Sequence, residues 1–159
     1  MIYSKIIIFI SSLVSFYAFS SNTIEFNISN KYNAEITTVG QEGDYEVKYK
    51  IFEKTRLIQE NIIHIDSERK IKMLIDDFNF DGKKDFSIWH MDEGMGTYKI
   101  FKIFVFTDKN HDFNEIHSPC GDDYIDVRVD NQKKELISSY FDDNRIKKCI
   151  TVKRNIMIK

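Results

Sequence analysis

Apolar and polar residues alternate along much of this 159-residue chain. The stretch Tyr45–Ile51 shows the alternation most clearly, because Tyr45, Val47, Tyr49 and Ile51 would share one face of an extended backbone. β-Branched and aromatic residues, which favour strands, are frequent, and no segment has the periodicity of a long amphipathic helix. The pattern therefore predicts a mainly β protein.

Turn residues separate these short segments at regular intervals. Such spacing is typical of antiparallel hairpins and meanders that form a sandwich, a barrel or a propeller-like array. Tyr98–Phe106 is apolar on nearly both faces, which predicts a central strand. The one helical possibility lies between Phe52 and Asn61. The expected strands span 23–28, 34–39, 45–51, 62–65, 71–75, 86–89, 98–106, 113–116, 124–129, 135–141, 146–152 and 155–158.

Residues 1–20 have the features of a secretory signal peptide. Lys5 supplies the positive charge, residues 6–19 are largely apolar, and Ala18–Ser20 fits the small-x-small cleavage pattern. The apolar stretch is shorter than the roughly 20 residues that a membrane-spanning helix needs. We therefore expect a periplasmic or secreted protein with no membrane span after cleavage, in which residues 21–159 form a single β-rich domain.

The charge balance of the mature chain is mild. The full chain has 23 Lys and Arg against 25 Asp and Glu, and cleavage removes one lysine, so the net charge becomes 22 − 25 = −3. Nucleic-acid-binding proteins need a strongly basic surface, so this balance argues against a nucleic-acid partner.

Two cysteines, Cys120 and Cys149, remain in the mature chain. In an exported protein an even number of cysteines favours a disulfide. The alternative is a metal site made by His111, His117 and Cys120, but that spacing matches no standard zinc pattern.

The densest group of oxygen-bearing side chains is the stretch Asp77–Asp85, DFNFDGKKD. Oxygen donors occupy every second position, and alternate side chains of an extended backbone point to the same side. Gly82 then allows a sharp turn. Calcium takes several oxygen ligands of mixed type, so the spacing predicts a Ca²⁺ site. The expected ligands are Asp77, Asn79, Asp81, the carbonyl of Lys83, and Asp85 either directly or through water.

This loop is not an EF-hand, because Ile88 stands where the bidentate glutamate would be. The segments on either side, 71–75 and 86–89, are too short for helices and rich in strand-forming residues. We interpret the stretch as a calcium loop between two strands, with Phe78 and Phe80 pointing away from the metal into a core. The alternative is an Asp/Asn/Gly turn that holds no metal.

The stretch Asp77–Phe86 resembles the D-x-N-F-D-G-x-x-D-hydrophobic signature of small extracytoplasmic calcium-binding proteins, and similar loops occur in FG-GAP and VCBS repeats. The loop after it, residues 89–98, contains two glycines and is expected to be flexible. The order of features from this loop onwards resembles that of bacterial periplasmic immunity proteins: the glycine-rich loop, the aromatic strand Tyr98–Phe106, a turn followed by Phe113, and the segment Lys133–Ser139. Those proteins inhibit peptidoglycan-degrading toxins delivered by type IV secretion, and their fold is similar to that of periplasmic lysozyme inhibitors.

The resemblance implies an exported calcium-binding protein that inhibits a peptidoglycan hydrolase. It also implies that a loop near residues 91–97 contacts the partner, with Glu93 and Tyr98 as candidate contact residues, although the family's Ser-Gly-x-x-Tyr pattern lacks its serine here. A calcium-stabilised surface or adhesion module explains the calcium loop equally well. No Ser/His/Asp, Cys/His or zinc-protease motif is visible in the sequence, so we expect a binding protein and not an enzyme.

Overall fold

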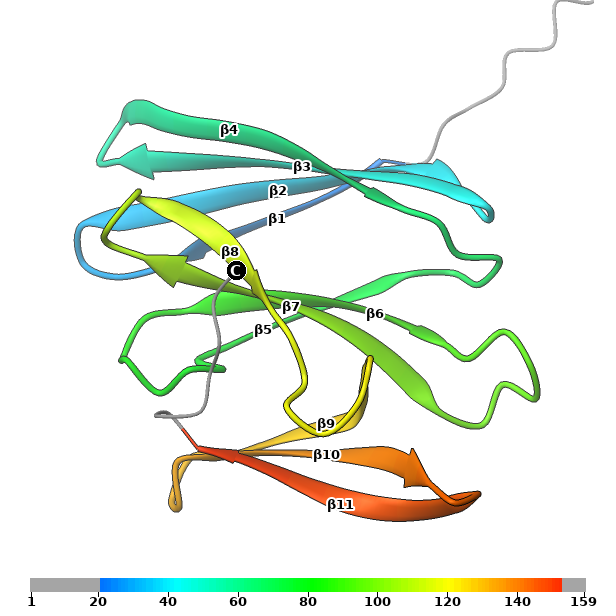
Figure 1. The fold of residues 1–159 in the computed structure, drawn as a ribbon. Helices are drawn as coiled ribbons and strands as arrows, with labels where there is room; N and C mark the ends of the chain where they lie inside the picture. Colours follow the sequence, from blue (N-terminus) through cyan, green and yellow to red (C-terminus); the bar gives the residue numbers. More distant parts are fainter. Residues whose placement is uncertain (1–20, 153–159) are drawn as a thin grey trace, which may run out of the picture.

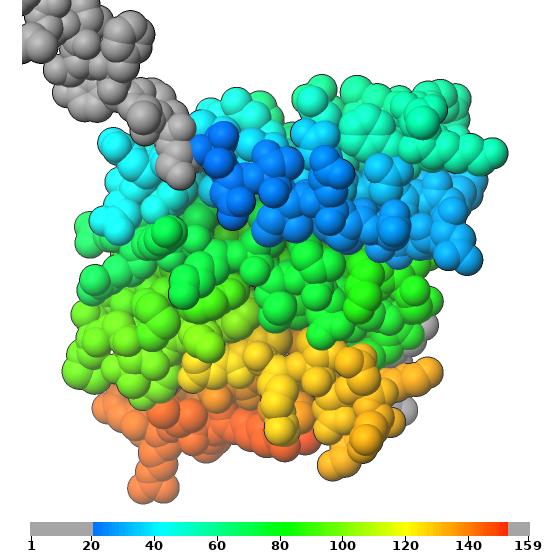
Figure 2. Space-filling view, turned by 180° about the vertical axis from the view of Figure 1, so that it is seen from behind, coloured from blue at the N-terminus to red at the C-terminus, as the bar shows by residue number. Residues whose placement is uncertain are grey.

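The computed structural model describes residues 21–152, which form a β-sandwich of two antiparallel sheets and no helix (Figure 1). The mainly β prediction is confirmed, in its sandwich form. Figure 2 shows from behind that the blue and cyan N-terminal residues lie on one side of the green residues and the orange-red C-terminal residues on the other. The first sheet has the order β1-β2-β3-β4 and contains β1 (Asn22–Asn27), β2 (Tyr32–Gln41), β3 (Asp44–Glu53) and β4 (Arg56–Ile65). The second has the order β11-β10-β9-β7-β6-β5 and contains β5 (Lys72–Asp76), β6 (Asp85–Met91), β7 (Lys99–Thr107), β9 (Tyr124–Asp130), β10 (Glu135–Asp142) and β11 (Arg145–Val152), while β8 (Asp112–Ile116) pairs with β7.

The main core lies between the two sheets. The four alternating residues of β3 predicted to share a face are all buried, so that prediction is confirmed. They face an aromatic group on the second sheet, in which the rings of Phe86 and Phe104 stack with centroids 4.9 Å apart and Phe113 meets Phe86 edge-on. Aromatic side chains bury large apolar areas, so these contacts hold the sheets together.

A second core lies on the other face of β7, under β9, β10 and β11. Its members include Phe101, Ile103 and Val105 of β7, together with Tyr124 and Leu136 from the C-terminal strands. Strand β7 therefore has buried residues on both faces and pairs with β6, β8 and β9, as its apolar sequence predicted.

A polar contact links the sheets beside the main core. Asp112, at the start of β8, accepts a hydrogen bond from the Tyr49 hydroxyl at 2.7 Å. Its second oxygen accepts from the amides of Asn61 at 2.9 Å and Gln59 at 3.1 Å. Desolvation of Tyr49 and its bond to Asp112 raise the pKa of the phenol well above its usual value. The carboxylate of Asp112 thus fixes the position of the second sheet against β3 and β4 of the first.

The structure corrects two sequence interpretations. Residues 52–61, the helical possibility, form the end of β3, a turn and the first half of β4, which pairs with β3. Strand β6 continues to Met91, beyond the expected end at Trp89, because pairing with β7 runs to Lys99. The disulfide between Cys120 and Cys149 is confirmed, with the Cα atoms 6.0 Å apart.

The expected signal peptide, 1–20, and the expected strand at 155–158 lie outside the described residues. Within residues 21–152, the structure contains no helix long and apolar enough to cross a membrane.

Candidate functional site

The stretch predicted to bind calcium, Asp77–Asp85, leads from the end of β5 to the start of β6, and we call it the oxygen-rich loop. Its two phenylalanines anchor it to the core. Phe78 is fully buried and Phe80 is 7% exposed, and both belong to the second core, which confirms their predicted role as anchors. Phe80 and Gly82 have φ values of 60° and 89°, in the left-handed region. Such backbone is tolerated where the surroundings fix it, and here it lets the loop close tightly between neighbouring strands.

The side-chain oxygens of this loop accept hydrogen bonds from the loop's own backbone. Asp77 accepts from the backbone N–H groups of Asp81 at 3.1 Å and Gly82 at 2.8 Å. Asn79 also accepts from Asp81 at 2.9 Å, and Asp81 accepts from Lys83 at 2.8 Å. Carboxylate and amide oxygens have two lone pairs each, so the side chains of Asp77, Asn79 and Asp81 still have lone pairs available for a metal. The loop's conformation is therefore set by its own chain.

Asp85 lies beneath the loop and is completely buried. Its two oxygens accept from the backbone N–H groups of Phe78 and Phe106, each at 2.9 Å, so the carboxyl group joins the loop to β7. Burial raises the pKa of Asp85 to about 8, and the nearby charges of Asp81 and Asp77 raise it as well, whereas the two N–H donors lower it. The acidic side chains of Asp77 and Asp81 thus lie close enough to Asp85 for their charges to raise its pKa.

Lys83 places an ammonium group next to these acidic side chains. Its Nζ lies 2.6 Å from Asp108 and 3.5 Å from an oxygen of Asp81. Desolvation lowers the pKa of Lys83, but its acidic neighbours raise it more. The ammonium therefore neutralises part of the charge of Asp81, and a bound metal would compete with it for that carboxylate.

The donor set suits a hard cation. Within the described residues, no group of three or more His, Cys, Asp or Glu side chains is arranged to hold a metal ion by itself. Calcium, however, also takes amide and carbonyl oxygens. Asp77, Asn79, Asp81 and the carbonyl of Lys83 are the groups that would hold it. Asp85 lies below them, and its raised pKa means that it would contribute a negative charge once a bound cation favours its carboxylate form. The unbalanced charge of these carboxyl groups would be relieved by a divalent cation.

A second feature, which the sequence did not reveal, is a set of internal hydrogen bonds in the loop between β6 and β7, residues 92–98. The carboxylate of Asp92 accepts hydrogen bonds from the backbone N–H groups of Gly96, Thr97 and Tyr98. These bonds, that of Tyr98 first, hold the pKa of Asp92 below its usual value. Met95 at the tip is 86% exposed. These bonds hold residues 92–98 in a fixed projection, whereas the glycines alone had suggested a flexible loop. We call residues 92–98 the braced loop.

The two predicted contact residues of this loop both have partners inside the molecule. Glu93 accepts a hydrogen bond from the backbone N–H of Glu68 at 3.0 Å, which ties the projection to the loop before β5. The ring of Tyr98 meets that of Phe141 edge-on, with centroids 5.4 Å apart. Glu93 and Tyr98 therefore also serve to position the loop.

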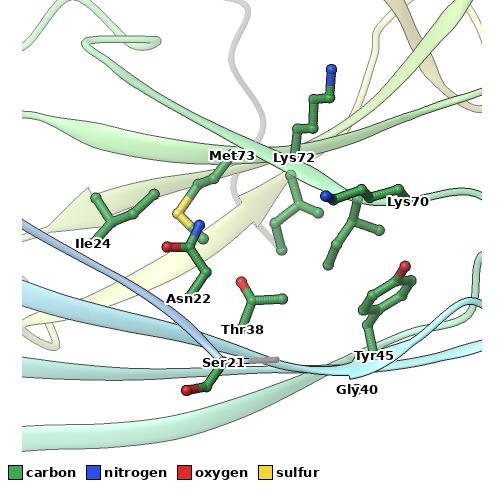
Figure 3. A pocket seen from close by; sticks show the side chains of 11 residues that line it. Ser21, Asn22, Ile24, Thr38, Gly40, Tyr45, Lys70, Lys72 and Met73 are labelled. Atoms are coloured by element: carbon green, nitrogen blue, oxygen red, sulfur yellow. The ribbon is translucent and has the colours of Figure 1, made fainter. Parts of the chain in front are cut away.

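A hollow of about 420 Å³ opens between the free edge strands β1 and β5. Figure 3 shows Ile24, Met73 and Tyr45 around it, with Lys72 directed away from the other side chains. Its lining contains Asn22 and Thr38 but no acidic or histidine side chain. This lining lacks the paired acid and base groups that hydrolytic chemistry uses.

Searches of protein families, of curated proteins and of solved structures found no significant match to this chain.

Proposed function

We propose that this chain is an exported calcium-binding protein that binds and inhibits a cell-wall peptidoglycan hydrolase, as a periplasmic immunity protein or lysozyme inhibitor. In this proposal the protein acts by binding and not by catalysis. The disulfide fits an oxidising compartment such as the periplasm. The resemblance of residues 77–86 to extracytoplasmic calcium loops supports the metal, and the crowding of acidic groups around Asp85 supports it further.

The observation that carries the inhibitory role is the braced loop with Met95 at its tip. A loop that already has its bound conformation loses little entropy when it enters a cleft, and this pre-organisation favours tight binding. Methionine is enriched at protein interfaces, where its flexible side chain adapts to the partner's surface.

The test has two arms, both with the mature chain, residues 21–159. In the first, calorimetry measures calcium binding to the wild type and to Asp81→Asn, for which we expect weaker binding. In the second, the protein is added in excess to purified peptidoglycan hydrolases. We expect inhibition that Met95→Asp abolishes, while Leu57→Asp, which changes another exposed apolar residue in the distant β3–β4 hairpin, leaves it intact.

A calcium-stabilised adhesion or structural module is the second candidate, because the loop at residues 77–85 supports it equally well. Calcium binding without inhibition of any hydrolase would favour this module over the inhibitor. Turnover of peptidoglycan by the protein alone would contradict both.

A further inference from the structure

Positive side chains gather at one end of the second sheet, beside the braced loop. A groove of about 370 Å³ lies there, lined by the cationic Arg69, Lys70 and Lys72 and by Trp89, Met91 and Met95, with no acidic residue in its lining. None of these three cations forms an ion pair with another described residue. Three positive charges therefore line the groove of a chain whose net charge is −2. The acidic residues nearest to it in the chain are Glu68, Asp92 and Glu93, and the last two accept hydrogen bonds from backbone N–H groups.

Trp89 orders two of the lysines around this groove. The Nζ atoms of Lys72 on β5 and Lys99 on β7 each lie 5.0 Å from the centroid of the Trp89 ring, and the ring stacks on Phe101. Figure 3 shows that the Lys72 side chain points away from the hollow between β1 and β5, which agrees with the position of its ammonium group over Trp89. Such cation–π contacts restrict flexible side chains, so the charges are presented in a defined arrangement.

The walls of the groove are also fixed in place. One wall is the segment before β5, in which Ser67 is buried and donates a hydrogen bond to the carbonyl of Arg69. The other is the braced loop, and the Glu93–Glu68 hydrogen bond joins the two walls. The groove therefore exists before any partner arrives.

We propose that this groove binds an acidic surface of a protein partner, with Arg69, Lys70, Lys72 and Lys99 facing the partner's carboxylates and Met95 inserted beside them. The inference rests on the proposed function, because it specifies the chemistry of the inhibited hydrolase. The combination of Met, Trp and Arg with surrounding charge is that of a protein interface.

Two other anionic ligands, an acidic glycan and a phospholipid bilayer, fit the groove less well. Sugar rings stack on open aromatic faces, but the Trp89 ring already contacts two ammonium groups and Phe101. An anionic bilayer would favour the cations, yet stable attachment needs a larger apolar face than the one strongly exposed methionine of this groove.

The inference makes a kinetic prediction. Charges that face an oppositely charged partner mainly accelerate association, and this effect is screened by salt. Binding to an acidic hydrolase should therefore weaken as salt rises. Reversal of two groove charges should weaken it by about ten-fold or more, chiefly through the association rate.

The experiment uses the mature protein and a panel of purified peptidoglycan hydrolases with acidic and basic surfaces. Surface plasmon resonance at several salt concentrations compares the wild type with the double variant Lys70→Glu, Lys72→Glu. The control is Lys133→Glu, Lys134→Glu, which reverses two charges in the distant β9–β10 turn. Thermal unfolding confirms that each variant is folded.

We expect acidic hydrolases to bind the wild type and the control alike, and the groove variant about ten-fold more weakly. If hydrolases are inhibited with no dependence on salt or on the groove charges, the inference is overturned and the proposed function stands. If no hydrolase binds, the proposed function fails and this inference fails with it. Binding to anionic phospholipid vesicles or to soluble anionic glycan in place of protein would likewise overturn it.

Discussion

Replacement of Asp85 by asparagine tests how the oxygen-rich loop is held. In the wild type both carboxyl oxygens accept buried backbone N–H groups, from Phe78 and Phe106. The side-chain amide introduced by D85N would keep one acceptor oxygen and turn its N–H₂ group towards the other donor. An unsatisfied buried donor costs about 1–3 kcal/mol, so we expect D85N to unfold more easily by that amount at pH 5.

The same carboxyl group gives metal-free stability a dependence on pH. Asp85 has its pKa raised to about 8 in the folded protein, from an ordinary value of 3.8. Between these values the folded chain holds a proton that the unfolded chain has lost, so the free energy of unfolding falls as pH rises. One proton gives a slope of roughly 1 kcal/mol per pH unit, so the advantage of the wild type over D85N should shrink by about 2–3 kcal/mol between pH 5 and pH 7.

Urea unfolding of both proteins in chelator, at several pH values, measures this difference and cancels the other titrating groups. Calcium favours the carboxylate form, so titration with calcium at pH 6 should release a proton, which calorimetry in buffers of different ionisation enthalpy detects. If the wild type instead gains stability over D85N as pH rises, the two N–H donors outweigh burial and Asp85 is ionised in the fold. That result would refute the reasoning from burial.

Three further predictions concern other parts of the structure. Lys83→Met removes the ammonium group 3.5 Å from Asp81 and should tighten calcium binding, measured by calorimetry, about five-fold. The control Lys84→Met should leave the calcium affinity unchanged. Equal calcium affinities of Lys83→Met and the wild type would show that the Lys83 ammonium does not compete with the metal. Replacing both cysteines by serine should lower the free energy of urea unfolding by about 3–4 kcal/mol, because a 29-residue separation is no longer closed, and an unchanged midpoint would contradict this. Asp112→Ala leaves the buried Tyr49 phenol and the Gln59 amide without their acceptor, while the Asn61 amide keeps only the Tyr49 hydroxyl, so it should cost about 2–4 kcal/mol. A loss below about 1 kcal/mol would show that water replaces the carboxylate.

The sequence predicted the sheet architecture because alternation reports burial directly. Tyr45 and Val47 could be assigned to a buried face from their spacing alone, and the central position of β7 followed from apolar residues on both of its faces. The anchoring of Phe78 and Phe80 was predictable for the same reason. The helical possibility at 52–61 failed because its polar residues fit a half-exposed strand at the edge of a sheet equally well.

The contacts that shape the sites were not predictable from local patterns. Asp85 was predicted as a metal ligand, directly or through water, and this stays a prediction. What the local pattern could not show is that its oxygens also accept from backbone groups, including one on β7 that is twenty-one residues further along the chain. The braced loop depends on Asp92 meeting three successive N–H groups, and the glycines around it suggested only mobility. The groove around Trp89 combines residues of three strands, so its charge is visible only after pairing is known.

Strand β6 connects the two sites, and this arrangement limits what calcium can do. It begins at Asp85 under the oxygen-rich loop and reaches Trp89 in the groove after about 13 Å of extended chain. Because β6 pairs with β5 on one side and β7 on the other, we expect it to keep the same arrangement with and without calcium. Calcium at about one hundred times its dissociation constant would then stabilise the fold by about 2.7 kcal/mol without changing the groove. Chelation should lower the melting temperature but leave partner affinity within about two-fold at temperatures where the protein stays folded. A loss of affinity of about ten-fold with an unchanged circular dichroism spectrum would show instead that the metal loop and the groove are coupled.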